Sequence, residues 1–304
     1  QGTRIAPIPQ GGGSGQRGLF AGGTPGNVST IQYITISTLG NTNDFGDQSV
    51  GGFSVAGASS STRAIFAGGE DPDAVIDVMD YVQFSTKGNA ADFGNLTDER
   101  NALAGLSNDT RAVFGGGYAD AVSNIMDYVT IATEGNATDF GDINSAATCR
   151  AGAASTTRGI FTGFNQVPAV VDNIDYITIG STGNITDFGD TTDARYAIGG
   201  ASSSVRAVFG GGRTSGGTVR NIIDYVTIAT TGDAADFGDL SVARYDASAV
   251  SNSTRAVFAG GETPYKNDMD YITIASTGDA ADFGDLASIL AGMGPASNGH
   301  GGLA

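Results

Sequence analysis

The fold is decided by a stretch of chain that reads TRAVFGGG at residues 110–117 and DYVTIATEGNATDFGD at residues 127–142. It holds three blocks: Arg-x-h-Phe (h is hydrophobic) followed by glycines, then Asp-Tyr-h-Thr-h, then Asp-Phe-Gly-Asp. With small variations, each block occurs six times. The third-block phenylalanines lie 48, 47, 48, 49 and 46 residues apart, and are Phe45, Phe93, Phe140, Phe188, Phe237 and Phe283. The chain is therefore six copies of one unit.

Variation in length is confined to one part of the unit. From the Tyr of the second block to the Phe of the third there are 12 residues in every copy, as from Tyr128 to Phe140. From the first-block Phe to the Tyr there are 13 to 16. The variable loops are residues 24–31, 70–79, 118–126, 165–174, 213–223 and 262–269. Equivalent loops of a closed repeat protein lie on one face, which is often the binding face.

The local pattern indicates β-structure throughout. The first two blocks are short runs of β-branched and aromatic residues bounded by glycine. A third strand fits Asp-Phe-Gly-Asp, and a fourth fits the Ala/Gly/Ser segment before each Arg, such as residues 245–250. A glycine follows each Tyr by seven residues, as Gly135 follows Tyr128, at a turn that we expect to need a positive φ. Four strands per unit and six units predict an all-β fold, a six-bladed β-propeller of four-stranded blades.

The three blocks resemble the kelch repeat, with Phe where that family usually has Trp. The complete sequence of residues 110–142 resembles, more narrowly, the kelch-like repeat proteins of marine tailed phages. This resemblance covers residues 17 to about 300. It implies a kelch-like propeller and a structural or tail-associated role in a virion. The resemblance is specific for the fold, less so for a viral or surface setting, and implies little about molecular activity.

The repeats start near residues 17, 63, 111, 158, 206 and 255, which predicts a propeller at residues 17–301 and a tail at 302–304. Two segments are candidates for the strand that closes the ring. Either residues 5–10 close it, or residues 286–298 do. In the second case residues 1–16, with Ile5, Pro7, Ile8 and Pro9 on a glycine-rich tether, form an arm that docks on a neighbouring subunit.

Charge restricts the partners. The chain has 32 acidic and 15 basic residues, for a formal net charge of −17. Nucleic acid and anionic membranes need a basic patch, so neither is expected as a partner. No apolar run is long enough for a membrane span.

Catalytic residues are not predicted. Kelch-type propellers include copper radical oxidases, but a copper site of that kind needs two His and a Cys bonded to Tyr. The chain has one His, His300, and one Cys, Cys149. We expect His300 to be solvent-exposed in the tail, and Cys149 to be a small buried thiol at a position where another copy has Ala102. No cofactor is expected except, as an alternative, calcium.

The acids of the third block have two interpretations. Asp and Asn beside Gly make turns by bonding their own backbone, which is the favoured interpretation. The alternative is a calcium site in each repeat, formed by residues such as Asp44, Asp47, Asp139, Asp142, Asp187 and Asp190. The Arg that opens each first block, together with Asp80, Asp127, Asp175, Asp224 and Asp270 beside the Tyr, predicts Arg–carboxylate pairs between strands or blades.

The variable loops supply the candidate ligand-binding residues, which are Tyr118, Arg213, Arg220 and Tyr265. Exposed Tyr and Arg on a rigid scaffold suit contact with glycan or protein, and neutral variation of tolerant loops is the alternative. The sequence thus favours a non-enzymatic structural component of a phage virion or an extracellular appendage that assembles with copies of itself or with other virion proteins. The alternative is an adhesin that binds a host surface glycan.

Overall fold

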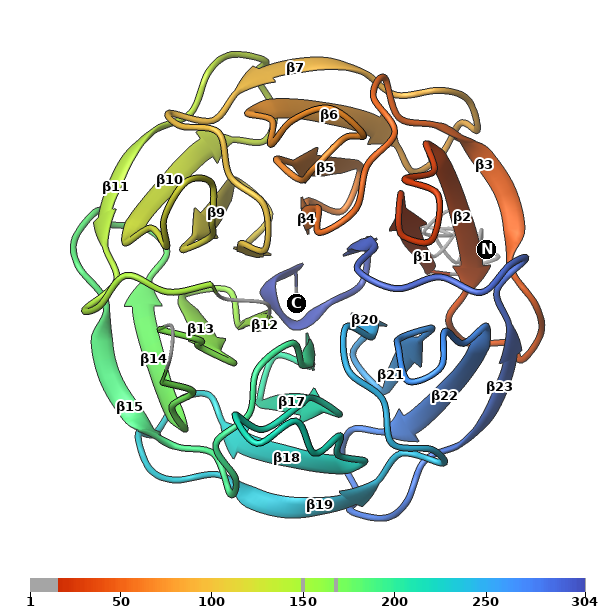
Figure 1. The fold of residues 1–304 in the computed structure, drawn as a ribbon, viewed down its shortest axis with the longest axis vertical. Helices are drawn as coiled ribbons and strands as arrows, with labels where there is room; N and C mark the ends of the chain where they lie inside the picture. The colour runs from red at the N-terminus through yellow and green to blue at the C-terminus, as the bar shows by residue number, and fades with distance from the viewer. Residues whose placement is uncertain (1–15, 149–150, 167–168, 304) are drawn as a thin grey trace, which may run out of the picture.

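The computed structural model describes residues 16–148, 151–166 and 169–303, and these form a ring of six four-stranded antiparallel sheets (Figure 1). The expected all-β, six-bladed propeller is confirmed. The described chain holds no helix of the length and apolarity that a membrane crossing requires.

The four strands of each blade lie side by side, in order from the ring axis outward. The innermost strands are β24 (Gly294–Ser297), β4 (Ala56–Ser59), β8 (Ala104–Ser107), β12 (Ala151–Ala154), β16 (Gly199–Ser202) and β20 (Ser248–Ser251). The second strands, which carry Arg-x-h-Phe, are β1 (Arg17–Ala21), β5 (Arg63–Ala67), β9 (Arg111–Gly115), β13 (Arg158–Thr162), β17 (Arg206–Gly210) and β21 (Arg255–Ala259). Blades one to six begin with β24, β4, β8, β12, β16 and β20.

The two outer strands carry the Tyr and Asp-Phe-Gly-Asp blocks. The third strands are β2 (Thr30–Thr35), β6 (Val78–Gln83), β10 (Ile125–Thr130), β14 (Asn173–Thr178), β18 (Ile222–Thr227) and β22 (Asp268–Thr273). The outermost are β3 (Asn43–Asp47), β7 (Ala91–Asn95), β11 (Thr138–Asp142), β15 (Thr186–Asp190), β19 (Ala235–Asp239) and β23 (Ala281–Asp285). A short 3-10 turn, η1 (Gly301–Leu303), follows the last strand.

The fourth strand begins later than the sequence suggests. In the sixth blade β20 starts at Ser248, because Tyr245 forms an isolated bridge to Glu262 and Asp246 has a φ of 55°. A residue in the left-handed region breaks the extended backbone, so residues 245–247 belong to the connector between blades.

The C-terminal strand closes the ring. β24 pairs antiparallel with β1, with Gly18 opposite Ser297 and Leu19 opposite Ala296. Closure by residues 5–10 would have required this same innermost place, and β24 occupies it. Residues 5–10 themselves, including the predicted arm residues Ile5, Pro7, Ile8 and Pro9, lie outside the described residues.

The outermost strands carry a bulge at Asp-Phe-Gly that joins neighbouring blades. In the third blade, Asp127 is opposite Asp139 and Met126 is opposite Gly141, so Phe140 is the extra residue. Gly141 has a φ of 141°, and a Cβ on it would lie 2.5 Å from the carbonyl oxygen of Gly183 in the fourth blade. The turn glycine thus packs on the bulge glycine of the preceding blade. The predicted positive φ of the turn glycine is confirmed at all six positions, which have φ values of 145° to 153°.

The core lies between the blades. One buried cluster combines Ile65 and Phe93 of the second blade with Phe114 and Val129 of the third. Because adjacent blades bury one another's side chains in this way, no blade has a complete core alone.

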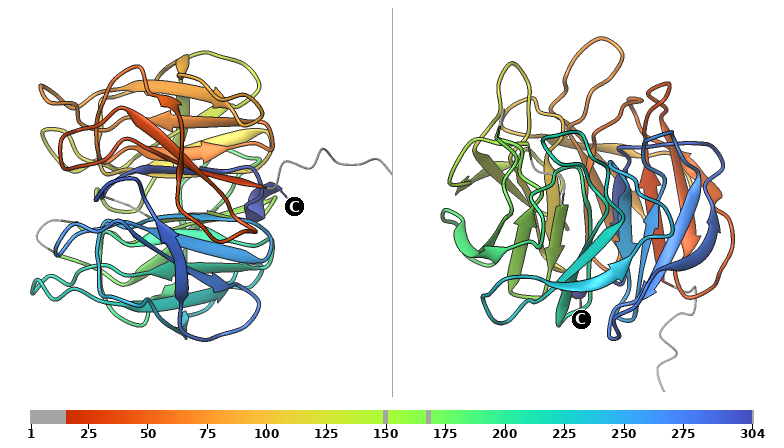
Figure 2. Two further views of the ribbon diagram at one scale, coloured as in Figure 1. Left: turned by 90° about the vertical axis from the view of Figure 1, so that its right-hand side faces the viewer. Right: turned by 60° about the horizontal axis from the view of Figure 1, so that its bottom comes forward.

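Strand direction places the loops. Since the four strands of a blade are antiparallel, the variable loops and the connectors between blades lie on one face. The hairpins that join the first strand to the second lie on the other. The C-terminal turn follows an innermost strand and therefore lies at the hairpin face, and the side view shows it at one face of the ring (Figure 2).

Candidate functional site

The first-block arginines are structural. Each guanidinium lies over the Tyr ring of its own blade, at 4.2 to 5.0 Å from the ring centroid. Each also donates to a backbone carbonyl of the next blade, as Arg111 Nη1 does to Ile179 O at 2.9 Å and Arg206 Nη1 to Ile274 O at 2.8 Å. The six Tyr rings in turn meet the third-block Phe edge to face, with centroids 5.8 to 6.1 Å apart.

The expected pairing of these arginines with the Asp beside Tyr was therefore wrong. Three of these five carboxylates pair with a second set of arginines, which lie in the connectors, seven residues after the third-block Phe. The pairs are Arg100 with Asp127, Arg195 with Asp224 at 2.8 Å, and Arg244 with Asp270 at 2.9 Å. All three arginines are at least 99% buried. Their fixed distance from that Phe was the signal that the sequence offered.

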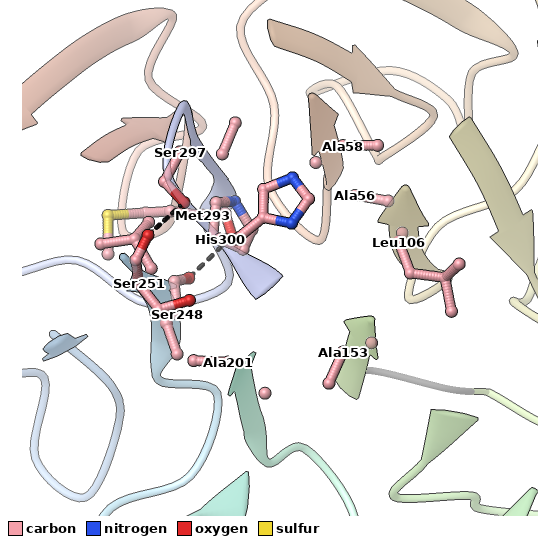
Figure 3. A pocket seen from close by; sticks show the side chains of 18 of the residues that line it. Ala56, Ala58, Leu106, Ala153, Ala201, Ser248, Ser251, Met293, Ser297 and His300 are labelled. Atoms are coloured by element: carbon pink, nitrogen blue, oxygen red, sulfur yellow. Dashed lines mark hydrogen bonds between the residues drawn. The ribbon is translucent and has the colours of Figure 1, made fainter. Parts of the chain in front are cut away.

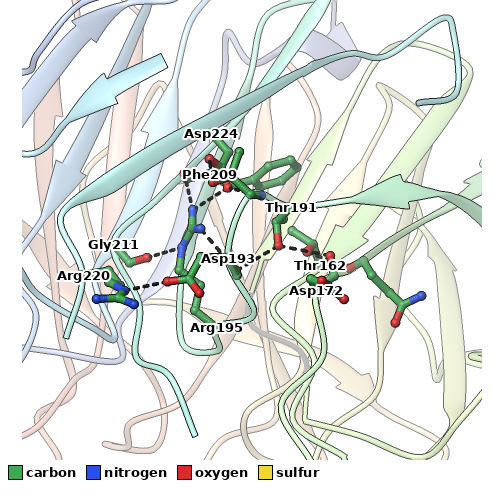
Figure 4. A network of polar contacts seen from close by, with 11 residues as sticks. Thr162, Asp172, Thr191, Asp193, Arg195, Phe209, Gly211, Arg220 and Asp224 are labelled. Atoms are coloured by element: carbon green, nitrogen blue, oxygen red, sulfur yellow. Dashed lines mark hydrogen bonds and ion pairs between the residues drawn. The ribbon is translucent and has the colours of Figure 1, made fainter. Parts of the chain in front are cut away.

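Each buried arginine also bonds backbone carbonyls. Figure 4 shows Arg195 between Asp224 and the carbonyl oxygen of Gly211, to which Nε donates at 2.7 Å. Because the Arg195 guanidinium is bonded to both carboxylate and carbonyl, burial leaves it well paired. These ion pairs hold the connectors into the third, fifth and sixth blades against the blades that they enter.

A narrow cavity lies on the axis. It has a volume of about 90 Å³ and is lined by the innermost strands, with His300 in its wall (Figure 3). Small-molecule sites usually measure about 300 to 1,000 Å³, so this one suits a few water molecules. Small residues account for its narrowness: a Cβ on Gly105 would lie 2.3 Å from the carbonyl oxygen of Gly57 in the adjacent blade.

Serines bond the innermost strands to each other. Each hydroxyl donates to the carbonyl oxygen of the equivalent residue in the preceding blade, as Ser251 Oγ does to Ser202 O at 2.8 Å and Ser297 Oγ to Ser251 O at 2.7 Å. Five blades have this serine, and the fourth has Ala154. The series of bonds is therefore interrupted between the third and fourth blades.

The C-terminal turn docks at this interruption. A Cβ on Gly302 would lie 1.9 Å from the carbonyl oxygen of Ser107, the acceptor that Ala154 leaves without a serine hydroxyl. His300 Nε2 lies 3.3 Å from Ser107 Oγ and 3.2 Å from Ser59 O. The expectation of an exposed His300 in a free tail was wrong, because glycines on both sides let this segment enter the axis. Burial lowers the pKa of His300 to about 4.

The four predicted ligand residues share the variable-loop face but do not form one cluster. Tyr118, 42% exposed, is in the third blade, and Tyr265 is in the sixth, on the opposite side of the ring. Arg213 lies over the ring of Tyr245 at 5.3 Å from its centroid. Arg220 Nε is paired with Asp193 at 2.6 Å (Figure 4).

Of the six predicted calcium ligands, Asp139 bonds its own local backbone as a turn residue does. Asp139 Oδ1 accepts from the backbone N–H of Gly141 at 3.1 Å, and Ser29 Oγ donates to Asp47 at 3.3 Å. Among residues 16–148, 151–166 and 169–303, no group of three or more His, Cys, Asp or Glu side chains is placed to hold a metal ion. Cys149 lies outside the described residues.

The chain matches no model of a known protein family and no curated protein. The structure itself shows a six-bladed β-propeller of four-stranded blades, the architecture expected of kelch-type repeats.

Proposed function

We propose that this chain is a non-enzymatic structural component of a phage virion or extracellular appendage, built on kelch-like repeats. It assembles with copies of itself or with other proteins of the particle. The observation that carries the proposal is that recurring and variable parts of each blade have different locations. Residues that recur in every blade are used in contacts inside the ring, whereas the differences in length between blades are in one loop per blade, on one face.

Repetition favours assembly over chemistry at one site. Six similar blades present similar surfaces around a rigid ring, and such a ring makes several weak contacts at once more readily than one asymmetric site. The kelch-like sequence of the repeat and its resemblance to marine phage proteins are the reasons for proposing a virion as the location. The net charge of −17 keeps such a surface soluble and argues against nucleic acid as the partner.

The oligomeric state tests the proposal. Light scattering coupled to size exclusion, with negative-stain imaging, would be applied to the full chain and to a chain without residues 1–16. We expect an ordered assembly, lost on truncation if the predicted arm makes the contact. A 30.5 kDa monomer in both samples, with no assembly on mixing with other particle proteins, would contradict the structural role.

Glycan binding is the second candidate, and it rests on the exposure of Tyr118 and on two arginines in the fifth-blade loop. An acidic glycan would replace Tyr245 as the neighbour of Arg213 and Asp193 as the partner of Arg220. The double variant Arg213→Ala, Arg220→Ala is then expected to weaken binding on a glycan array at least tenfold. Retention of full binding would place the glycan site elsewhere.

A further inference from the structure

The second and fourth blades lack the buried arginine of three other blades but keep its carboxylate partner; in the second blade, Ser49 Oγ donates to that carboxylate, Asp80, at 2.7 Å. At the position of Arg100, Arg195 and Arg244, the connector into the fourth blade has Ala147. Asp175 remains beside the Tyr and is 94% buried, with a relative exposure of 6%. The first blade shows the contrasting case, because there both positions are uncharged, with Leu290 and Gln32.

The carboxylate of Asp175 is also without the hydroxyl that serves the equivalent aspartates. Thr97 Oγ1 donates to Asp127, and Ser241 Oγ donates to Asp270 at 2.7 Å. In the fourth blade, Asn144 stands at this position. Within the described part of the chain, Asp175 has no hydrogen-bond or ion-pair partner.

Asp175 faces a cavity of about 140 Å³ on the variable-loop side, whose wall includes Asn144, Phe164, Gln166 and Asn173. Phe164 is at the place of a glycine in the arginine-bearing blades. A Cβ on Gly117 would lie 3.1 Å from the Cβ of Arg100, so a large side chain there and a buried arginine exclude each other. Phe164 thus takes the place of the arginine stem, and space remains next to the carboxylate.

The acceptors around that space are those that bind guanidinium elsewhere in the ring. Arg100 Nη1 donates to Ile125 O at 2.8 Å, and Arg244 Nη1 donates to Asp268 O at 2.8 Å. The equivalent backbone carbonyl in the fourth blade is that of Asn173, which accepts one bond, from Thr162 Oγ1 at 2.9 Å. A carbonyl oxygen has two lone pairs, so it can accept a second.

We propose that this cavity binds a guanidinium group from outside the blade, with Asp175 as its counter-ion and Phe164 in its wall. A carboxylate, a carbonyl oxygen and an aromatic ring together match a planar, singly charged, hydrogen-bond-donating cation. A divalent metal fits less well, because calcium takes about six to eight oxygen ligands, commonly with more than one carboxylate among them, and this cavity supplies one carboxylate. Asp187 and Asp190 add negative potential near the site.

The group has two sources, a free guanidinium compound or an arginine side chain of a partner protein. Isothermal titration of the full chain would compare methylguanidinium with the peptide acetyl-Gly-Arg-Gly-amide. The same peptide with citrulline is the neutral control, since citrulline keeps the shape of arginine and lacks its charge. Calcium chloride tests the divalent alternative. Binding of methylguanidinium alone would assign a free compound, and tighter binding of the arginine peptide would assign a partner protein.

Two variants locate the site. Asp175→Asn should weaken the binding of the guanidinium probe about tenfold or more, because a charge-assisted bond is lost. Asp120→Asn, which removes an exposed acid in the third blade, is the matched control and should change nothing. The proposal is overturned if neither probe binds, if Asp175→Asn binds as well as the unchanged chain, or if calcium alone binds at Asp175.

Discussion

Arg255 Nη1 in the sixth blade donates to the carbonyl oxygen of Ile36 in the first blade at 3.0 Å. These residues are 219 positions apart, yet the bond repeats the one that every other blade makes with its neighbour. Together with the pairing of β24 and β1, it makes the junction between the ends of the chain equivalent to the other five. The ring is therefore held by the same contact throughout.

Loss of this contact should destabilise the ring. Arg255→Met keeps most of the apolar stem but removes the bond to Ile36 and the stacking on Tyr271. We expect a loss of about 2 kcal/mol in the free energy of unfolding, measured by urea denaturation. Arg213→Met, in a variable loop, is the control, because it removes stacking on the ring of Tyr245 but no bond between blades, and it should cost less than about 1 kcal/mol. Equal losses in the two variants would show that the blade-to-blade bond contributes nothing particular.

The bulge glycines should not tolerate a side chain. Gly238 has a φ of 141°, and its Cβ would lie 2.5 Å from the carbonyl of Gly278, so Gly238→Ala is expected to cost about 3 kcal/mol. Gly180 has an open environment with nothing within 4 Å, and Gly180→Ala should stay within about 1 kcal/mol of the unchanged protein. Thermal unfolding measures both. A Gly238→Ala variant as stable as Gly180→Ala would refute the close packing of turn on bulge.

Asp175 should make stability depend on pH in an unusual direction. Burial and the carboxylates of Asp187 and Asp190 raise its pKa to about 7, above its ordinary value of 3.8. Because the folded-state pKa is the higher one, the folded protein holds an extra proton between about pH 4 and pH 7, and this group's effect lowers stability as pH rises through that range. Asp175→Asn should therefore be more stable than the unchanged chain by about 2 kcal/mol at pH 8, and equal to it near pH 4.

Asp224→Asn is the informative comparison. It leaves Arg195 buried without its counter-ion, so it should destabilise the protein by about 3 kcal/mol at pH 8. Urea denaturation at both pH values compares the two variants. Destabilisation of both to the same degree would mean that Asp175 is paired in solution.

His300 reports on the C-terminal turn. It is the one His of the chain, so its imidazole gives a single signal in an NMR titration. We expect a pKa of about 4 in the unchanged protein, and a return toward 6.5 in Gly302→Ala, whose Cβ would displace the turn from Ser107. Since the folded-state pKa is depressed, the contribution of this group to stability is complete above about pH 6.5 and falls as the pH approaches 4.

Gly216→Ala, in an open part of the fifth-blade loop, is the control for that substitution. It should leave the titration of His300 unchanged. A pKa near 6.5 in the unchanged protein would show that the turn does not enter the axis in solution.

Much of the fold could be predicted from local patterns. Alternating β-branched residues, fixed turn glycines and a 46-to-49-residue repeat predicted strands, turns and blade number, because backbone conformation is set by near neighbours. The predictions of which side chains pair with each other were less accurate. The Asp beside the Tyr in five blades was assigned to the first-block Arg, but in three of these blades it pairs with Arg100, Arg195 or Arg244 of the connectors. His300 was expected in water because its glycine neighbours are typical of a tail.

The sequence by itself determined the unit, its number and the face on which it varies. Only the tertiary structure decided which groups meet across blades: Arg255 with Ile36, Gly302 with Ser107, and the cavity beside Asp175. The physical reason is that two of these features are contacts with backbone carbonyls and the third is a cavity. Every residue has a carbonyl and no residue type encodes a cavity, so such partners are defined only when the ring closes.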